Sequence, residues 1–250
     1  MIIVFFMPSV SHRLDRFIAR RLSINIRAVR ELLIQKKITL NGEVASLMNQ
    51  PIGIFTAVVV DGDVLQHRDP VYIMLNKPKG VVSATKDDRH TTVIDIIDHP
   101  NKHELHIAGR LDFNTTGLLL LTNDGAWSKQ LSLPENAVNK IYRVSLQKPL
   151  TPDIIIKYQQ AFATGIHLLP ENITTRPATL TVLNDHTVEL TISEGRYHQV
   201  KRMFGFFQYE VVELHRLSIG DIILDKGVVL GASRLLTAQE EGLRRSSLVN

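Results

Sequence analysis

The chain of 250 residues contains no cysteine. Disulfide bonds, thiolate metal ligands and a cysteine nucleophile are therefore excluded, which fits a cytoplasmic protein. No apolar run approaches the roughly 18 residues that a membrane-spanning helix requires, so we expect no membrane contact. Residues 1–6 are apolar but too short for a secretory signal. We expect residues 1–9 to be a disordered or start-site extension, with residues 1–6 a translation-start artefact or a tag.

Signatures of cofactor-dependent chemistry are also missing. The sequence has neither the Gly-x-Gly-x-x-Gly pattern of dinucleotide binding nor a phosphate-binding P-loop. No group of His and acidic residues has the spacing of metal ligands, and Asp61 and Asp63 flank Gly62 in a manner more typical of a tight turn. We therefore expect an activity that needs no cofactor and no metal ion.

The excess of positive charge is confined to the first quarter of the chain. The formal net charge is +4 and the sequence pI is about 9.3. Residues 1–68 contain nine Lys and Arg against five Asp and Glu, whereas the remaining residues contain twenty of each kind. A positive segment joined to a neutral one predicts a unit that docks on a polyanion and a separate catalytic unit.

The pattern of residues 10–68 predicts a small domain with two helices and a sheet. Apolar residues recur at helical spacing from Leu14 to Leu22, and Asn25 stands at the N-cap position of a second helix. Asn41-Gly42 between two short extended runs is a strong hairpin signal, and residues 58–65 are typical of a strand with a tight turn.

Basic side chains of this domain fall outside the apolar stripes of the predicted helices. The candidate RNA-binding residues are Arg13, Arg16, Arg20, Arg27, Arg30, Lys36 and Lys37. They form either an ordinary solvated face or a surface for nucleic-acid phosphates. The clustering of the whole net charge favours the second interpretation, in which these contacts supply affinity and carry little sequence information.

Residues 69–250 form the second predicted domain, after a polar linker that ends at Pro70. Apolar runs and alternation predict strands at residues 71–75, 141–146, 180–183, 188–192 and 211–215, and helices at 126–131 and 151–163. Many strands with few intervening helices predict an α+β domain with a mixed, largely antiparallel sheet flanked by helices, and argue against a repeating βαβ unit.

The most informative string is residues 109–117, Gly-Arg-Leu-Asp-Phe-Asn-Thr-Thr-Gly, which continues into four leucines, Leu118 to Leu121. It places one carboxylate, Asp112, on a turn before a segment that we expect to be buried on all sides. An isolated Asp in such a place most often caps a turn or a helix. Strings elsewhere in the chain favour a catalytic role instead.

Four strings, in matching order and spacing, resemble the motifs of a family of ribosomal RNA pseudouridine synthases. They are residues 75–80, 109–125, 140–144 and 190–204, and the resemblance covers about residues 11–240. The N-terminal domain is similar in layout to the S4 RNA-binding domain, whose Arg-Leu-Asp opening stands here as Arg13-Leu14-Asp15. Lys36-Lys37 is a departure, because many S4 domains have a glycine there.

The resemblance implies isomerisation of a uridine to pseudouridine in RNA, by base flipping and without a cofactor. It implies that Asp112 is the nucleophile or base, that Tyr142 stacks on the target base, and that Lys201 pairs with the catalytic carboxylate. The further substrate or base-pocket residues that it implies are Arg110, Leu190, Ile192, His198 and Arg202. Whether Asp112 attacks the ribose, adds to the uracil ring or abstracts a sugar proton stays open.

Structural interpretations remain for several of these residues. Tyr142 fits plain strand packing, and Lys201 and Arg202 fit a solvated pair; Arg202 is also the alternative partner of Asp112. Lys77 and Lys79 in the first motif either contact RNA or flank a turn shaped by proline and glycine, and we favour the turn.

The last motif separates branches of the family. Residues 196–203 read Arg-Tyr-His-Gln-Val-Lys-Arg-Met, whereas members acting on large-subunit RNA typically have Arg-Asn-Arg-Gln-Ile/Val-Arg-Arg-Met. The resemblance therefore favours the branch that modifies uridine-516 of 16S rRNA, with a 23S rRNA uridine as the alternative. The expected partner is 16S rRNA within an assembling small subunit, and we expect a monomer. A non-catalytic rRNA-binding assembly factor is the alternative of another class.

Overall fold

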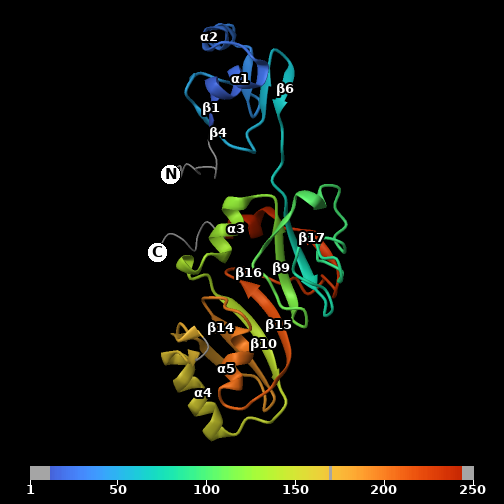
Figure 1. The fold of residues 1–250 in the computed structure, drawn as a ribbon, viewed down its shortest axis with the longest axis vertical. Helices are drawn as coiled ribbons and strands as arrows, with labels where there is room; N and C mark the ends of the chain where they lie inside the picture. The colour runs from blue at the N-terminus through green and yellow to red at the C-terminus, as the bar shows by residue number, and fades with distance from the viewer. Residues whose placement is uncertain (1–11, 169–170, 244–250) are drawn as a thin grey trace. The chain divides into compact units, whose positions relative to one another are not determined.

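The structure is a computed structural model that describes residues 12–168 and 171–243 (Figure 1). The chain divides between Pro70 and Val71 into two compact units, which we call the N-terminal unit (residues 12–70) and the sheet unit (residues 71–243). The predicted extension, residues 1–9, lies outside the described residues. Within the described ranges, no helix combines the length and the apolar character needed to cross a membrane.

The N-terminal unit contains two helices and two small sheets. The helices are α1 (Leu14–Leu22) and α2 (Ile26–Ile34). The larger sheet is antiparallel and has the order β3 (Glu43–Val44), β2 (Ile38–Leu40), β5 (Val58–Val60), β6 (Asp63–Gln66), and a separate pair joins β1 (His12–Arg13) to β4 (Pro51–Ile52). The two predicted helices and the predicted hairpins are confirmed.

Local sequence explains where these elements begin and turn. The Asn25 side chain accepts a hydrogen bond from the backbone N–H of Ala28 at 2.9 Å, so the predicted N-cap of α2 is confirmed. Asn41 and Gly42 have φ angles of 51° and 86°, the left-handed conformation that a two-residue hairpin turn requires. The apolar stripes of α1 and α2 then pack against β2 and β5 in one core.

The sheet unit is organised around one mixed sheet. Within the described residues, nine strands join it, and only β9 and β15 pair in parallel. The main order is β13 (Thr179–Val182), β14 (Thr187–Ile192), β10 (Lys140–Leu146), β15 (Val211–Ile219), β9 (Thr116–Thr122), β7 (Tyr72–Lys77), β17 (Ser233–Leu235), while β16 (Ile222–Ile223) pairs with β15 and β8 (His106–Ala108) with β9. The predicted mixed, largely antiparallel sheet is confirmed.

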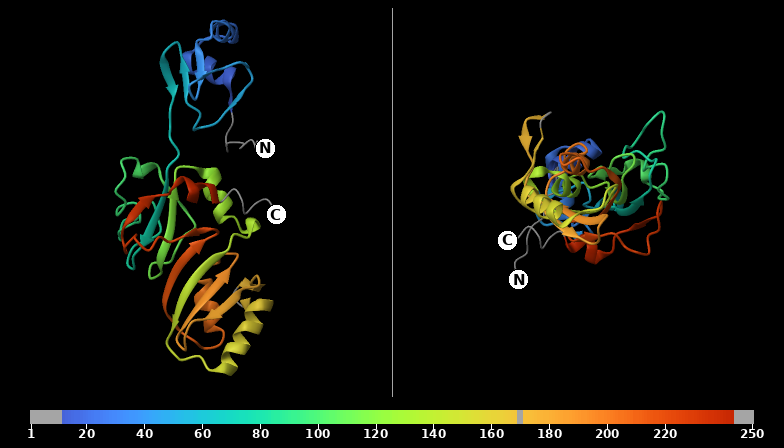
Figure 2. Two further views of the ribbon diagram at one scale, coloured as in Figure 1. Left: turned by 180° about the vertical axis from the view of Figure 1, so that it is seen from behind. Right: turned by 90° about the horizontal axis from the view of Figure 1, so that it is seen from below.

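Helices cover both faces of this sheet. The described helices of the unit are η1 (Lys102–Glu104), α3 (Gly125–Ser132), η2 (Pro134–Asn136), α4 (Pro152–Thr164), α5 (Gln199–Gly205) and α6 (Ala238–Leu243), and a ribbon of β11 (His167–Leu168) and β12 (Ile173–Thr174) follows α4. Helices α4 and α5 lie on the same face of the sheet (Figure 2). Tyr158 and Phe162 of α4 contact Phe204 of α5 there. Trp127 and Leu131 of α3 belong to a second core on the other face.

The run of four leucines in β9 shows how the two cores share one strand. Leu118 and Leu120 pack in the core beneath α3, and Leu119 and Leu121 pack in the core beneath α4 and α5. All four are fully buried, because successive side chains of a strand point to opposite faces and both faces are covered. The expectation of a segment buried on all sides is confirmed, and the turn that carries Asp112 is attached to the centre of the sheet.

Candidate active site

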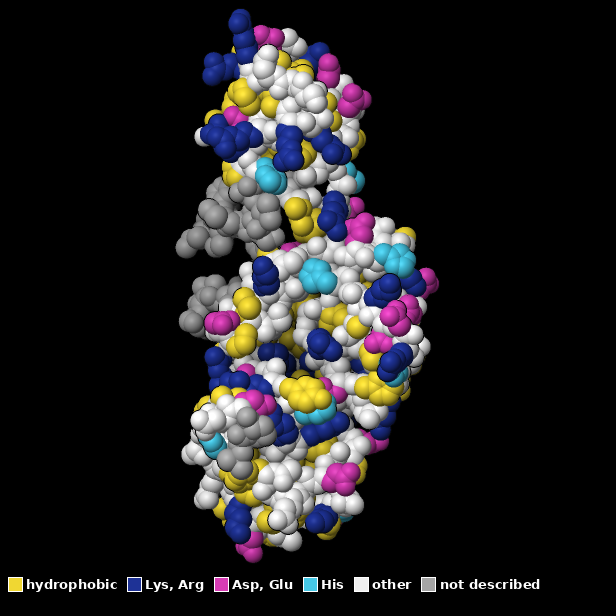
Figure 3. All heavy atoms as spheres, in the orientation of Figure 1, with side chains coloured by type: hydrophobic (Ala, Val, Ile, Leu, Met, Phe, Trp, Pro, Cys, Tyr) yellow, Lys and Arg dark blue, Asp and Glu magenta, His cyan; other side chains and the backbone are white. Residues whose placement is uncertain are grey.

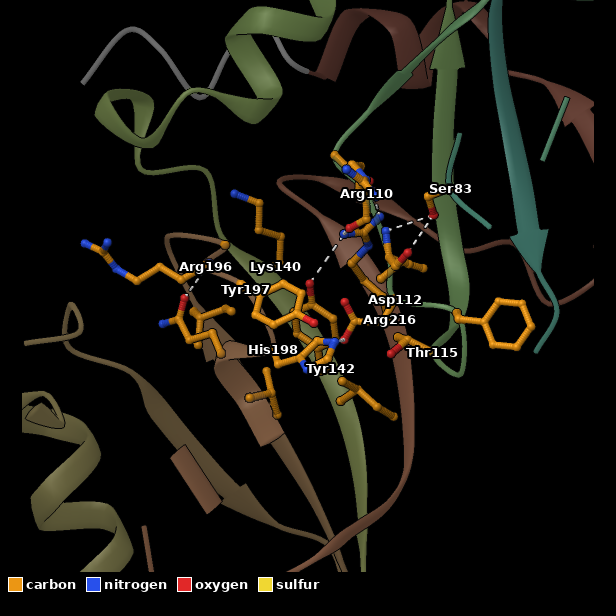
Figure 4. A pocket seen from close by; sticks show the side chains of 18 of the residues that line it. Ser83, Arg110, Asp112, Thr115, Lys140, Tyr142, Arg196, Tyr197, His198 and Arg216 are labelled. Carbon is orange, nitrogen blue, oxygen red and sulfur yellow. Dashed lines mark hydrogen bonds and ion pairs between the residues drawn. The ribbon is translucent and has the colours of Figure 1, made fainter. Parts of the chain in front are cut away.

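A cavity of about 690 Å³ opens where the turn before β9, strands β10 and β15 and the start of α5 meet (Figure 4). On the molecular surface the sheet unit has a hollow around which Lys and Arg side chains gather (Figure 3). Of the residues that the sequence singles out, the cavity lining brings together Arg110, Asp112, Tyr142, Ile192 and His198. These residues come from three of the four motif strings, so the fold brings side chains from separate motifs to one cavity.

Asp112 lies at this cavity with 30% of its side chain exposed. Its Oδ2 atom is 3.6 Å from Nε2 of His198, a contact that is an ion pair only with a protonated imidazole. The His198 residue has a φ angle of 48° and directly precedes α5. The left-handed turn thus carries the imidazole to the carboxylate across the cavity.

A buried lysine holds the backbone of the Asp112 turn. Nζ of Lys77, at the end of β7, donates hydrogen bonds to the carbonyl oxygens of Pro78, Asp112, Phe113 and Thr115 at 3.0–3.3 Å. The side chain is fully buried. Burial lowers the pKa of Lys77 to about 8, although the negative charge of Asp112 acts in the opposite direction. Lys77 therefore has a structural role, but that role is to hold the Asp112 turn, which the sequence did not predict.

Ser83 fixes the same turn from its other side. Its hydroxyl donates to the carbonyl of Leu111 at 2.7 Å and accepts from the backbone N–H of Leu111 at 3.1 Å. Ser83 is buried and also lines the cavity. The residue next to Asp112 in the chain is thus held at both polar backbone atoms, which restricts where the carboxylate can lie.

Arg216 is the central cation of the site, and sequence reasoning did not single it out. Its guanidinium, on β15 and only 2% exposed, donates to the carbonyls of Leu118 and Gly109 at 2.8 Å each and to that of Arg110 at 3.3 Å. It also reaches the Tyr142 hydroxyl at 3.4 Å and lies 5.9 Å from the centre of that ring. The sequence offered one signal for Arg216: it is a charged residue at a strand position where the alternation predicts a buried side chain.

The close approach of β9 and β15 at this point requires glycine. Gly117 pairs with Arg216 and has a φ angle of 103°. A Cβ atom at Gly117 would lie 2.3 Å from the Arg216 carbonyl oxygen, a distance that no side chain tolerates. The Thr-Gly of the motif therefore serves to bring the arginine strand against the strand that follows the Asp112 turn.

The turn before α5 is braced by a buried carboxylate. Glu194, 3% exposed, accepts hydrogen bonds from the Arg196 guanidinium at 3.0 Å and from the Gln199 amide at 2.8 Å. The Gln199 side chain in turn accepts from the backbone N–H of Arg196 at 2.9 Å. Residues 195–198 are thereby fixed at the rim of the cavity.

Three of the predicted site residues lie elsewhere and are corrected. Leu190 is fully buried in the core, and Ile192, two residues along β14, lines the cavity instead. Lys201 does not line the cavity, since Gln199 and Val200 take the inward positions on the first turn of α5. The Arg202 guanidinium binds Glu171 and the carbonyl of Tyr197. Neither cation pairs with Asp112.

Lys140 adds a second cation that the sequence did not single out. It lines the cavity from the start of β10, is 7% exposed, and donates to the carbonyl of Val138 at 2.9 Å. Burial lowers the pKa of Lys140 to about 8, and the positive charges of Arg216 and Arg176 act in the same direction. Its charge is therefore sensitive to pH near neutrality.

The predicted RNA-binding residues of the N-terminal unit are all exposed. Three of them are paired: Arg13 with the buried Asp15 at 2.7 Å, Arg27 with Glu31 at 3.7 Å and Lys37 with Asp61 at 2.8 Å. The hydrogen bond from Arg13 holds the pKa of Asp15 below its usual range. The others, Arg16, Arg20, Arg30 and Lys36, make no ion pair with a described residue.

No group of three or more His, Cys, Asp or Glu side chains in the described ranges is arranged to hold a metal ion.

Comparison with known proteins agrees with this fold. A solved structure described as a pseudouridylate synthase superposes with a TM-score of 0.65 at 40% identity, covering 92% of this chain and 99% of that chain. The fold is thus that of a pseudouridine synthase. Residues 71–205 also match the family model of RNA pseudouridylate synthases.

Two curated relatives are similar over almost their whole length. Ribosomal small subunit pseudouridine synthase A of Pseudomonas aeruginosa is 43% identical over 229 residues, which cover 91% of this chain and 98% of the relative. The protein of the same name from Escherichia coli is 42% identical over 229 residues, or 91% and 97%. The chain belongs to the RNA pseudouridylate synthase family, and it is an enzyme that isomerises uridine to pseudouridine in RNA.

Proposed function

We propose that this enzyme modifies the RNA of the small ribosomal subunit, converting uridine-516 of 16S rRNA to pseudouridine. The names of the relatives from Pseudomonas aeruginosa and Escherichia coli support this target. So does the pair Tyr197-His198, which stands where the large-subunit branch typically has Asn-Arg. The partner is 16S rRNA, within an assembling small subunit in the cytoplasm, and the protein acts as a monomer.

The observation that carries the chemistry is the charge of the cavity. Among the described residues that line it, Asp112 is the single acid, and four are cations: Arg110, Lys140, Arg196 and Arg216. Cations suit a polyanionic substrate. Hydrolysis of a glycosidic bond commonly uses two carboxylates on either side of the bond, and the described lining offers one.

One carboxylate suffices for an isomerisation. The reaction breaks the bond between C1′ of the ribose and N1 of the uracil and forms a bond between C1′ and C5. N1 gains a proton and C5 loses one, so atoms and electrons balance without a redox partner. In this proposal Asp112 is the nucleophile or base, and the hydrogen bonds of Lys77 and Ser83 fix the turn that presents it.

The walls of the cavity have roles that follow from their chemistry. Tyr142, whose ring is held by Arg216, stacks on the uracil, and Ile192 completes the apolar part of the wall. Arg110 is exposed at the rim, where a planar cation suits the space that the flipped base leaves in the RNA. His198 fixes the orientation of the Asp112 carboxylate.

The N-terminal unit is proposed to be an S4-like RNA-docking domain. Its two helices carry exposed arginines, and four of its seven candidate cations are free of ion pairs with described residues. Such a surface binds phosphates and contributes affinity without reading bases. Target choice then depends on the residues around the cavity.

Pseudouridine mapping of 16S and 23S rRNA, in cells with and without the gene, tests the activity and the target together. The deletion strain is complemented with wild type, Asp112→Asn or Asp185→Asn, the last being an exposed loop carboxylate outside the cavity. We expect loss of the 16S site, restored by wild type and Asp185→Asn. Asp112→Asn is expected to lower the rate by about 10⁴-fold or more while RNA affinity stays unchanged.

Other outcomes contradict parts of the proposal. Loss of a 23S site would retain the chemistry and move the target to the large subunit. Restoration by Asp112→Asn would exclude the carboxylate as the reacting group. Unchanged modification of both RNAs, with tight RNA binding by the purified protein, would favour a non-catalytic assembly factor.

A further inference from the structure

An exposed aromatic residue stands at the rim of the cavity. Tyr197 is 75% exposed, the highest fraction among the large apolar side chains in the described part of the chain. It lines the cavity and directly precedes His198. An aromatic ring contributes much binding free energy when it is covered, and the described residues leave most of this one uncovered.

One face of the Tyr197 ring already rests on a support. Its centroid lies 3.9 Å from that of the His198 ring, with 19° between the planes, which is a stacked geometry. His198 contacts Asp112 in turn, so the two rings and the carboxylate follow one another toward the cavity, as Figure 4 shows. The tyrosine is therefore connected to the reacting group through a single intervening side chain.

The backbone beneath the ring is rigidly held. The Tyr197 carbonyl accepts a hydrogen bond from Arg202 at 3.2 Å, and the preceding residue, Arg196, is tied to Glu194 and Gln199. Arg202, which lies outside the cavity, thus helps to hold the backbone that carries Tyr197. A preorganised ring loses little conformational entropy when a ligand covers it.

We propose that Tyr197 is a stacking platform for the base of a nucleotide adjacent to the target uridine. This inference rests on the proposed function and adds a substrate-binding residue to it. The target uracil enters the cavity against Tyr142, which is 7% exposed, while the neighbouring base stays outside on the free face of Tyr197. Aromatic side chains hold unpaired RNA bases in this way, with phosphates bound by nearby cations such as Arg110 and Arg196.

The platform also provides a basis for choosing the target. Stacking on an aromatic ring requires a neighbour that is unpaired and able to leave its own stack. A uridine flanked by firmly paired nucleotides would not present such a base. Tyr197 would therefore select for the local structure around the uridine, a property that phosphate contacts lack.

The test compares variants of the full-length protein on a fragment of 16S rRNA that spans uridine-516. Tyr197→Leu removes the ring and keeps an apolar side chain, and Tyr197→Phe keeps the ring. Phe206→Leu is the matched control, because Phe206 is an exposed aromatic at the other end of α5 and does not line the cavity. We expect Tyr197→Leu to raise the dissociation constant by roughly 5- to 150-fold. Tyr197→Phe and Phe206→Leu should lie within about twofold of wild type, and the single-turnover rate of Phe206→Leu at saturating RNA should match that of wild type.

RNAs with an abasic nucleotide on the 5′ or the 3′ side of the uridine identify the partner of the ring. For wild type, one of the two abasic RNAs should bind as weakly as intact RNA binds Tyr197→Leu. For Tyr197→Leu, the same abasic RNA should cause no further loss, because the interaction has already been removed. The other abasic RNA should bind both proteins more weakly than intact RNA does, by the same factor for each protein.

Two results would overturn the proposal. In the first, each abasic RNA lowers the affinity of Tyr197→Leu by the same factor as that of wild type. In the second, Tyr197→Phe raises the dissociation constant as much as Tyr197→Leu does. Failure of the proposed function is a distinct result. If mapping in cells without the gene shows no loss of the 16S site, the assigned target fails, whereas the dissociation constants of the same four proteins and three RNAs still decide whether Tyr197 stacks on a neighbouring base.

Discussion

The cations of the two units differ in burial, and their positions determine what each can do. In the N-terminal unit the candidate RNA-binding cations are all exposed, and Arg16, Arg20 and Arg30 project from helices without ion pairs to described residues. In the sheet unit, Lys77 and Arg216 are buried and satisfy backbone carbonyls around the Asp112 turn. Exposed charges attract a polyanion through solvent, while buried charges hold a backbone shape.

The net charge of a segment reveals exposed cations that attract a polyanion, but it does not reveal buried cations that hold the backbone. Residues 69–250 are neutral in sum, yet four cations and one acid line the cavity of the sheet unit. Removing a cation should therefore lower RNA affinity in one unit, and should lower stability and turnover in the other.

Lys77→Met removes the ammonium that four carbonyl oxygens share. Buried acceptors left unsatisfied cost about 1–3 kcal/mol each, and loss of the buried charge offsets part of that cost, so we expect unfolding free energy to fall by about 3 kcal/mol. A shift of the Asp112 turn by about 1 Å should also reduce turnover by about 10²-fold. Urea unfolding and single-turnover kinetics measure the two effects.

Lys79→Met is the matched control for this variant. Lys79 lies two residues away, is exposed, and pairs with Glu213 at 3.5 Å. Its replacement should change the unfolding free energy by no more than about 0.5 kcal/mol. Equal stability of the two variants would mean that the Lys77 ammonium does not hold the turn, and the contrast between buried and exposed cations would fail there.

The site also shows which features a sequence can reveal. The Asn25 cap and the leucines of β9 are local signals, and both were predicted correctly. Asp112, Tyr142 and His198 were found through motifs and meet in the cavity. Arg216 was missed because its side-chain hydrogen bonds span 74 residues or more of chain, and its importance depends on the pairing of β9 with β15.

The error over Lys201 has a related cause. Lys201 and Val200 are neighbours in the chain, but helical geometry turns successive residues about 100° apart. Val200 points inward and Lys201 does not line the cavity. A short helix of seven residues has too few apolar positions to fix its inner face from sequence alone. A motif therefore located the region without specifying the side chain that faces the carboxylate.

Neutralising the exposed cations should have an intermediate effect, confined to RNA binding. The triple variant Arg16→Gln, Arg20→Gln, Arg30→Gln is expected to reduce the slope of log affinity against log salt by about 2, since each phosphate contact contributes roughly 0.7 on single strands. Folding stability should stay within about 0.5 kcal/mol of wild type, because these side chains are exposed and unpaired. Filter binding across a salt series gives the slope.

A second triple variant separates position from total charge. Lys129→Gln, Lys148→Gln, Lys157→Gln removes the same charge from exposed sites of the sheet unit that do not line the cavity. Its salt slope should match that of wild type. If both triple variants lower the slope equally, net charge and not the N-terminal surface accounts for RNA affinity, and the docking role of that unit is excluded.

The smallest expected effect concerns Lys140, which combines burial with a place in the cavity. Because burial lowers its pKa to about 8, Lys140 is charged below that pH and becomes neutral above it. RNA affinity should therefore fall as pH rises from 7 to 9.5, by about two- to fivefold for one partly screened charge. The charged groups that act on Lys140 are Arg216, Arg176 and Glu194.

Lys140→Arg and Lys140→Met test this assignment in the same binding assay. Arg stays charged and Met stays uncharged throughout, so both variants should lose the part of the pH dependence that Lys140 causes in wild type, and Lys140→Met should bind RNA more weakly than Lys140→Arg. Lys77 also titrates near pH 8 but is present in all three proteins, so its contribution cancels in the comparison. If Lys140→Arg retains the wild-type pH dependence, another group is responsible. Lys140 would then contribute to the shape of the cavity, as Lys77 does for the Asp112 turn, and would not cause the pH dependence of RNA affinity.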